Sequence, residues 1–424
     1  MVTLKTKLVF GMLMASLSLV GLSSCSSDDS RPTDPVTNDD DNTGGDPVDD
    51  GPSIIGFLAC EGGQAGVYPC SGMNLMSQIP IELFSATRGN DSWGWVDPAT
   101  GREYALMGLN NGTAFVDITS PSNPLYLGKL PTASTSSNWR DIKVFNDHAF
   151  IVAEASGHGM QVFDLTKLRD VSSPPEIFSA DALLTEFGSA HNIVINEDTG
   201  YAYAVGASDF EGGPLFINIQ DPINPVVEGG YADGNYTHDA QVVTYNGPDT
   251  EHLGKEIFIG SNEDEIVIVD ITDKTNPIAL STIGYTNVGY THQGWFTEDQ
   301  RHFLLGDELD EVQIGTRSRT IVFDFSDLDT PAVHTTYLGP TFAIDHNGYV
   351  LNNDFYLANY TAGIRQIDLS DIASASMTEL AFFDTYPDND DASFNGVWSV
   401  YPYLPSGNII VSDISGGLFI VARQ

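Results

Sequence analysis

A short apolar run that ends in an acid or amide recurs along the chain. In each copy two to four apolar residues lead into Asp or Asn, and the turn that follows usually closes with Pro. The clear copies are FVDITSPSNP at 115–124, FINIQDPINP at 216–225, IVDITDKTNP at 268–277 and VFDFSDLDTP at 322–331. With two looser copies, the acid or amide positions fall 44 to 54 residues apart, at Asp117, Asp164, Asn218, Asp270, Asp324 and Asp368. Self-similarity at this period is typical of stacked β units, most often propeller blades.

One full repeat divides into four strands. In the copy around residue 268, strands are expected over 238–244, 256–260, 265–271 and 277–283. The third strand is almost wholly apolar, as expected of a strand buried on both faces between neighbouring blades. The Asp that ends it can accept hydrogen bonds from the next backbone amides in an Asx turn. We therefore predict a structural role for the repeated acid or amide, with a ligand role as the alternative.

Counting third strands gives the number of blades. They are expected at 114–118, 160–165, 215–219, 265–271, 320–325, 363–369 and 417–421. The last ends close to Gln424, so its blade lacks a fourth strand. Residues 79–83 resemble a fourth strand and are predicted to supply it, which removes the open sheet edges. The pattern predicts an all-β fold, a β-propeller of seven four-stranded blades closed by an N-terminal strand, with six or eight blades as alternatives.

The first residues of the chain carry a different pattern. Lys5 and Lys7 precede an apolar run from 8 to 20, which is too short to span a bilayer, and the run leads into Leu22-Ser23-Ser24-Cys25. This layout resembles that of bacterial lipoproteins, which implies a signal peptide over 1–24 and a lipid on the thiol of Cys25. An ordinary signal peptide with an incidental Cys is the alternative. The acidic residues that follow resemble an export signal, so we expect an outer-membrane lipoprotein that faces the cell exterior.

Composition then divides the rest of the chain. Residues 25–52 hold almost nothing apolar and are expected to form a disordered acidic tether, leaving 53–424 for the propeller. The formal net charge of −41 excludes nucleic acid as a partner and excludes docking on anionic lipid, so the lipid anchor is the expected membrane contact. Cations and basic or neutral partners remain as candidates, and a charge that only keeps the surface solvated is the alternative.

Cys60 and Cys70 are expected to form a disulfide in an exported protein, and a reactive or metal-binding thiol pair is the alternative.

Several longer strings resemble a known family. The IVIVDIT at 266–272 resembles the LVIVD repeat. The stretch from Cys60 to the C-terminus resembles the bacterial choice-of-anchor B proteins, through the segment between Cys60 and Cys70, WGWVDPATGREYALMG at 93–108, WRDIKV at 139–144 and GHGMQVFDL at 157–165. The resemblance implies an extracellular repeat region attached to the cell, here through Cys25. It implies no catalytic residue.

A second signal recurs where the first strand of each unit begins. Four successive units place a histidine at this position: His191, His238, His292 and His346. Inner strands line the central channel of a propeller, so these side chains are expected around one channel mouth. The loops between second and third strands should open at the same end, and their acids are Glu154, Asp209, Glu263, Asp264, Asp307, Glu308 and Asp413.

Imidazoles with oxygen neighbours suit a transition metal. The four-histidine iron oxygenases built on seven-bladed propellers offer an analogy at the level of the fold only. Repeats copied from one ancestor also keep a residue for structural reasons, and His191 and His346 could stand too far apart to share one ion. The acidic loops at 262–265, 307–311 and 384–391 are candidates for Ca²⁺, with solvated loops as the alternative.

Two functions fit these observations. The first is a cell-surface or outer-membrane lipoprotein whose rigid propeller binds a protein, glycan or ion ligand without turnover. The second is a metal-dependent enzyme, an oxygenase or hydrolase, with the four histidines as ligands and Glu154 or Glu308 as general base. The sequence carries no nucleophile elbow, zincin helix, phosphate loop or dinucleotide fingerprint, which favours the first function.

Overall fold

The computed structural model describes residues 52–424. The predicted signal peptide, the lipidation at Cys25 and the tether up to residue 51 lie outside the described residues. Within 52–424, no helix has the length and apolar character needed to cross a membrane.

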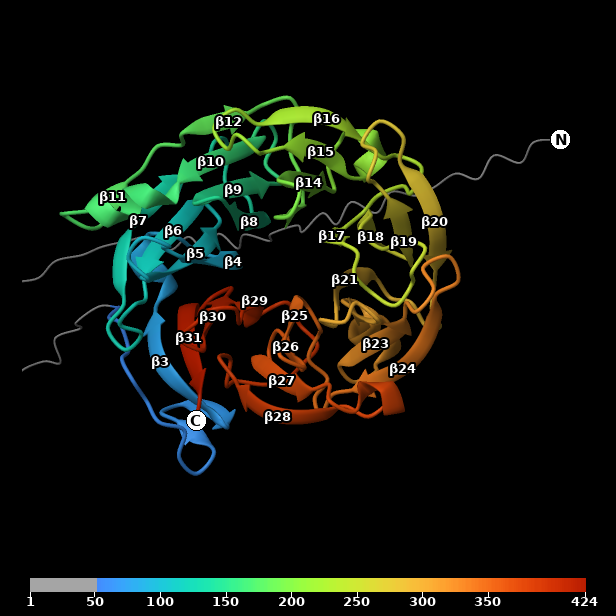
Figure 1. Cartoon of the computed structure of the whole chain (residues 1–424). Coiled ribbons are helices and arrows are strands. Elements are labelled where there is room, and N and C mark those ends of the chain that lie inside the picture. The colour runs from blue at the N-terminus through green and yellow to red at the C-terminus, as the bar shows by residue number, and fades with distance from the viewer. Residues whose placement is uncertain (1–51) are drawn as a thin grey trace, which may run out of the picture. The chain divides into compact units, whose positions relative to one another are not determined.

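Seven antiparallel sheets stand around a common centre, as Figure 1 shows. From the inner to the outer strand, the first blade consists of β4 (Gly89–Val96), β5 (Glu103–Leu109), β6 (Gly112–Asp117) and β7 (Leu125–Pro131). The second consists of β8 (Arg140–Phe145), β9 (His148–Ala153), β10 (Met160–Asp164) and β12 (Ala182–Leu184). The third consists of β13 (Asn192–Asn196), β14 (Tyr201–Val205), β15 (Leu215–Asn218) and β16 (Val226–Gly230). The next two are β17 (Asp239–Thr244), β18 (Glu256–Asn262), β19 (Glu265–Asp270) and β20 (Ile278–Ile283); and β21 (Thr291–Phe296), β22 (His302–Asp307), β23 (Arg319–Asp324) and β24 (Ala332–Leu338).

The last two blades meet the N-terminal part of the described chain. They are β25 (Gly348–Leu351), β26 (Asp354–Ala358), β27 (Ile364–Asp368) and β28 (Thr378–Phe383); and β29 (Val397–Tyr401), β30 (Asn408–Asp413), β31 (Gly417–Arg423) and β3 (Met73–Ile79). Short strands extend two outer edges: β1 (Gln64–Ala65), β2 (Tyr68–Ser71) and β11 (Glu176–Ile177). The short helices are η1 (Ile81–Phe84), η2 (Leu165–Asp170), η3 (Phe210–Gly212), η4 (Ile372–Ser374) and α1 (Asp310–Ile314). The predicted all-β propeller of seven four-stranded blades is confirmed.

The repeated acid or amide has the structural role that the sequence predicts. In every copy its side-chain oxygen accepts a hydrogen bond from the backbone N–H two residues later, as Asp270 does from Thr272 at 3.0 Å. The same bond forms at Asp117, Asp164, Asn218, Asp324 and Asp368. This Asx turn ends the third strand of the first six blades and turns the chain toward the fourth strand.

The strand that closes the ring begins earlier than predicted. The expected segment was 79–83, but β3 ends at Ile79 and pairs with β31 from Met73 opposite Arg423 to Ile79 opposite Leu418. Pro80 has no N–H to donate, so the chain leaves the sheet there and forms η1. Ile81 and Phe84 of η1 are buried in the core between the last and first blades. Closure by an N-terminal strand is confirmed, and its predicted boundaries were wrong.

Neighbouring blades share their hydrophobic cores, which fixes them relative to one another. Ile259 and Ile266 of the fourth blade pack in one cluster with Phe303 and Phe323 of the fifth. The predicted disulfide joins Cys60 to Cys70, with a Cα–Cα distance of 6.0 Å. Cys70 lies in β2, which pairs with β28 at the outer edge of the sixth blade. The segment around the disulfide therefore covers an edge that would otherwise be open.

Candidate metal centre at the channel mouth

The four predicted histidines form a continuous arc. Each lies at or just before the start of an inner strand, on four successive blades. Successive ring centroids are 4.1 Å apart for His191 and His238, 4.3 Å for His238 and His292, and 4.3 Å for His292 and His346. The repeat therefore places four imidazoles side by side at one end of the channel.

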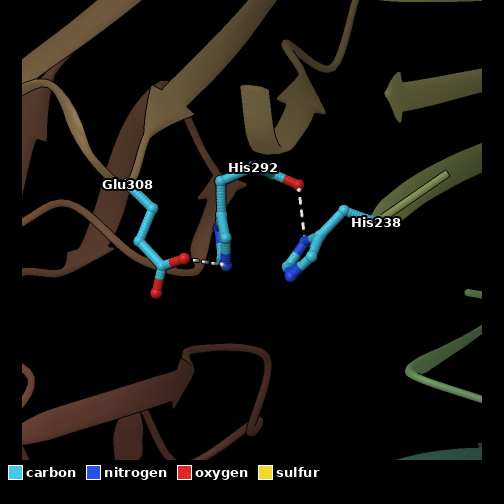
Figure 2. Close-up of side chains that lie close together, drawn as sticks. All are labelled: His238, His292 and Glu308. Atoms are coloured by element: carbon cyan, nitrogen blue, oxygen red, sulfur yellow. Dashed lines mark hydrogen bonds and ion pairs between the residues drawn. The ribbon is translucent and has the colours of Figure 1, made fainter. Parts of the chain in front are cut away.

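Backbone carbonyls of the next blade fix the proton on two of these rings. The Nδ1–H of His238 donates to the carbonyl of His292 at 3.2 Å (Figure 2), and that of His346 donates to the carbonyl of Trp398 at 2.5 Å. With the proton on Nδ1, the Nε2 atom keeps a free lone pair. Hydrogen bonds of this kind orient histidines that bind metals. His191 makes a comparable contact, because its Nδ1 lies 2.7 Å from Glu154 Oε1.

Glu308 supplies a carboxylate to the arc. It follows β22 directly, in the loop to the third strand. Its Oε2 lies 3.7 Å from His292 Nε2, and its Oε1 lies 3.6 Å from His346 Nε2. Figure 2 shows the Glu308 carboxylate facing the His292 ring. One ligand atom each from His238, His292 and Glu308 lies within 4.8 Å of the other two. Ligand atoms at about 2.0–2.2 Å from a zinc ion are separated by roughly 3.3–3.6 Å in a tetrahedron, so the three groups need to approach one another by up to about 1.5 Å to share one ion.

Three imidazoles of the arc, those of His238, His292 and His346, are held in the neutral form that binds metals. Burial and neighbouring imidazoles lower the pKa values of His238 and His292 well below the usual range, and burial lowers that of His346 to about 3. Burial raises the pKa of Glu308 to about 7. The Nδ1 atom of His292 is buried and has no hydrogen-bond partner among residues 52–424. Neutral imidazoles stand ready as ligands without first losing a proton.

A cavity of about 280 Å³ lies over the arc. Besides the four histidines and Glu308, its lining consists of Arg88, Asn138, Trp139, Tyr360, Phe394 and Trp398. The Tyr360 hydroxyl donates to Glu308 Oε1 at 3.0 Å. Sequence reasoning missed Tyr360 because it considered only acids in the loops between second and third strands, although Tyr360 lies in such a loop.

The structure does not gather all of the predicted acids. Glu154 and Glu308 contact the histidines, but Asp209 starts η3 and Glu263 lies beside the Tyr290 hydroxyl at 3.4 Å. The carboxylates of two others accept hydrogen bonds from backbone N–H groups of nearby loops. Asp307 accepts hydrogen bonds from the backbone of Gly289 and Tyr290, and Asp413 accepts from the backbone of Ser415 and Gly416. These two carboxylates stabilise turns and do not contact the imidazoles.

A buried acidic belt occupies the channel below the arc. Asp91, Asp141 and Asp239 lie near the starts of three inner strands, together with Lys143. The Lys143 Nζ atom lies 2.6 Å from Asp141 Oδ1 and 4.0 Å from Asp91 Oδ2. Asn347 donates to Asp91 at 3.2 Å. Each aspartate of the belt lies one residue after the position at which four blades carry a histidine. The sequence shows this pattern at Asp141 and Asp239, but no role was predicted from it.

We expect the substitution Asp91→Asn to change how stability depends on pH. Burial and the neighbouring Asp141 raise the pKa of Asp91 to about 7. A carboxyl with a raised folded-state pKa stabilises the fold below its unfolded pKa of 3.8, and that contribution is lost as the pH rises through 7. Between pH 5 and pH 8, Asp91→Asn should therefore gain about 2–3 kcal/mol in unfolding free energy relative to wild type.

Urea unfolding at both pH values measures this gain. Asp221→Asn, at an exposed turn, is the matched control and should follow wild type at both. A difference between Asp91→Asn and wild type that is equal at pH 5 and pH 8 would contradict the prediction.

Comparisons with known proteins found a match to a repeat family and similar solved structures. Residues 253–283 match the LVIVD repeat family. A chain of hydrazine synthase from Kuenenia stuttgartiensis superposes with a TM-score of 0.53 at 10% sequence identity, covering 76% of this chain and 92% of that chain. The Cps50 (Swd1) β-propeller domain of Myceliophteria thermophila gives a TM-score of 0.49 at 10% identity, over 76% and 93% of the two chains. No curated protein matches the sequence.

Proposed function

We propose that this chain is a surface-displayed propeller whose channel mouth binds a transition-metal ion through His238, His292 and Glu308. The observation that carries the proposal is the convergence of two neutral imidazoles and a carboxylate, each supplying an atom within 4.8 Å of the others. Attachment through a lipid on Cys25, display at the cell exterior and membership of the choice-of-anchor B proteins complete the proposal. They are supported by the sequence features near the N-terminus and by the LVIVD match.

The donor set favours zinc or a neighbouring divalent transition metal over Ca²⁺. Two imidazole nitrogens and one carboxylate oxygen are typical of zinc sites, whereas Ca²⁺ takes six to eight oxygens. His346 stands on the far side of Glu308, at 3.6 Å, and can add a further nitrogen to the site. His191 ends the arc, with its Nδ1 beside Glu154 and its ring against that of His238.

A metal-dependent enzyme is the second candidate. The cavity of about 280 Å³ lies directly against the three ligands, and a catalytic metal keeps one position open toward such a space. Glu308 is then shared between metal binding and proton transfer. Zinc-dependent hydrolysis of p-nitrophenyl acetate that disappears in Glu308→Gln would favour this candidate over simple binding.

Calorimetric titration of chelator-treated residues 26–424 with ZnCl₂ tests the proposal. We expect one equivalent to bind, with an affinity reduced at least 100-fold in His292→Ala and in His238→Gln. At 100 times its Kd, the ion should also stabilise the wild type by about 2.7 kcal/mol. His148→Ala is the control, because His148 lies on β9 away from the arc. Equal binding by wild type and His292→Ala, or no binding of Zn²⁺, Cu²⁺, Co²⁺, Mn²⁺ or Fe²⁺, would contradict the proposal.

A further inference from the structure

A second cavity of about 460 Å³ lies at the other end of the same channel. Its lining comes from the ends of the inner strands, for example Val243 in β17 and Phe296 in β21, whereas the histidines stand at the strand starts. A strand rises about 3.3 Å per residue, so Val243 lies roughly 16 Å from His238 along its strand. The acidic belt with Lys143 separates the two cavities.

The cavity has one aromatic wall and one aliphatic wall. Trp93 and Tyr401 form an edge-to-face pair with centroids 4.9 Å apart, and Tyr401 contacts Tyr403 at 5.3 Å. Trp295 continues this wall. The apolar lining from the second to fourth blades is aliphatic: Val144, Val194, Ile195, Val242 and Val243. Lys143, Glu197 and Gln241 are the polar lining residues from the same blades. Such a space accepts a flat apolar group between the two walls.

Besides Lys143, the charged groups that line the cavity are Glu197 and Glu298, two acids that are exposed to solvent. Glu298 accepts one hydrogen bond through Oε1, from the Asn352 N–H at 2.8 Å. Glu197 has no hydrogen bond or ion pair within residues 52–424. The one cation in the lining, Lys143, is bound to Asp141 at 2.6 Å. Two carboxylates without a cation, on a chain with a net charge of −41, favour a positively charged ligand.

We propose that this cavity binds a small organic cation with a flat apolar body, of the aryl-alkyl amine class. The ring of the ligand packs between the aromatic and aliphatic walls, and its ammonium group lies against Glu197 and Glu298. An ammonium near Trp295 or Trp93 also gains the attraction between a cation and an aromatic face. This site is independent of the metal centre, because the two share no lining residue.

Three probes with the same ring test the charge requirement. Phenethylamine, 2-phenylethanol and phenylacetate are titrated at pH 7.5 into residues 26–424, with tryptophan fluorescence and calorimetry as readouts. The amine should bind about tenfold tighter than the alcohol, which corresponds to about 1.4 kcal/mol, and phenylacetate should bind more weakly than the alcohol. Glu197→Gln and Glu298→Gln should each reduce the affinity for the amine severalfold and leave that for the alcohol unchanged.

Two controls separate this site from other effects. Glu82→Gln, on η1 and outside the lining, should bind the amine as wild type does, and so should the metal-site variant His292→Ala. Equal affinity for the amine and the alcohol, an unchanged amine affinity in both Glu→Gln variants, or no binding of any probe at 10 mM would overturn the proposal. Binding of glucose in place of the amine would overturn it as well.

Discussion

Replacing Lys143 with Met should lower the free energy of unfolding at pH 8 by about 3–5 kcal/mol. Lys143 is buried beside Asp141 and Asp91, and its pKa is raised by these carboxylates and Asp239 despite its burial. Met fills most of the volume of the lysine stem, which packs over Trp93, but supplies no charge. The substitution leaves buried carboxylates without their cation, which costs far more than the loss of one exposed ion pair. Urea unfolding monitored by fluorescence measures the loss.

The pH dependence of this loss identifies its cause. At pH 5 the deficit should shrink, because Asp91 and Asp239, whose pKa values are raised by burial, take up protons in place of the missing cation. Adding Asp141→Asn to the Lys143→Met variant should also recover part of the stability. Lys167→Met, at a half-exposed position, is the control and should change stability by less than about 1 kcal/mol. A deficit of equal size at pH 5 and pH 8 would show that lost packing is responsible.

The substitution Gly417→Ala should destabilise the fold by about 3 kcal/mol or more, because it places a methyl group between the two strands, β3 and β31, that close the ring. Gly417 starts β31 with a φ of +90°, and a Cβ atom there would lie 2.2 Å from the Ile79 carbonyl oxygen of the closing strand. The clash is with backbone, so β3 and β31 must separate to relieve it. Thermal and urea unfolding should both report the loss.

Gly101→Ala separates the clash from the backbone conformation. Gly101 has a φ of +70° and no atom within 4 Å of the position of a Cβ. Its substitution should cost only the strain of the left-handed conformation, about 1–2 kcal/mol. If Gly417→Ala and Gly101→Ala lowered the free energy of unfolding equally, the clash between β31 and β3 would add nothing to the loss.

The blades were predictable because their signal is local. The apolar third strand and the Asx turn after it need only a few consecutive residues, and Asp270 with Thr272 shows the whole mechanism within three positions. The closing strand was harder, because its partner lies at the other end of the chain. Residues 79–83 look like a fourth strand, yet the register with β31 places Met73–Ile79 in the sheet and Pro80 at its end.

The histidine arc was predictable for the same reason, and the details that suit it to metal were not. The repeat places His238 and His292 at equivalent positions of neighbouring blades. The proton on His238 Nδ1 is fixed by a carbonyl 54 residues away, and Glu308 reaches His292 from an adjacent strand. The repeat period does not predict either contact, because one joins two neighbouring blades and the other joins two strands within one blade. Lys143 was overlooked because it is the one lysine among the inner-strand positions that form the belt, so no repeat points to it.

Anomalous diffraction from crystals of residues 26–424 soaked in ZnCl₂, recorded at the zinc absorption edge, shows whether the channel mouth binds a transition metal. We expect a strong peak within about 2.0–2.3 Å of His238 Nε2, His292 Nε2 and a Glu308 carboxylate oxygen. The same measurement on His292→Ala should lose that peak. Zinc found only at other clusters, such as His302 with Asp324 and His334, with none between His238 and His292, would contradict the proposed site.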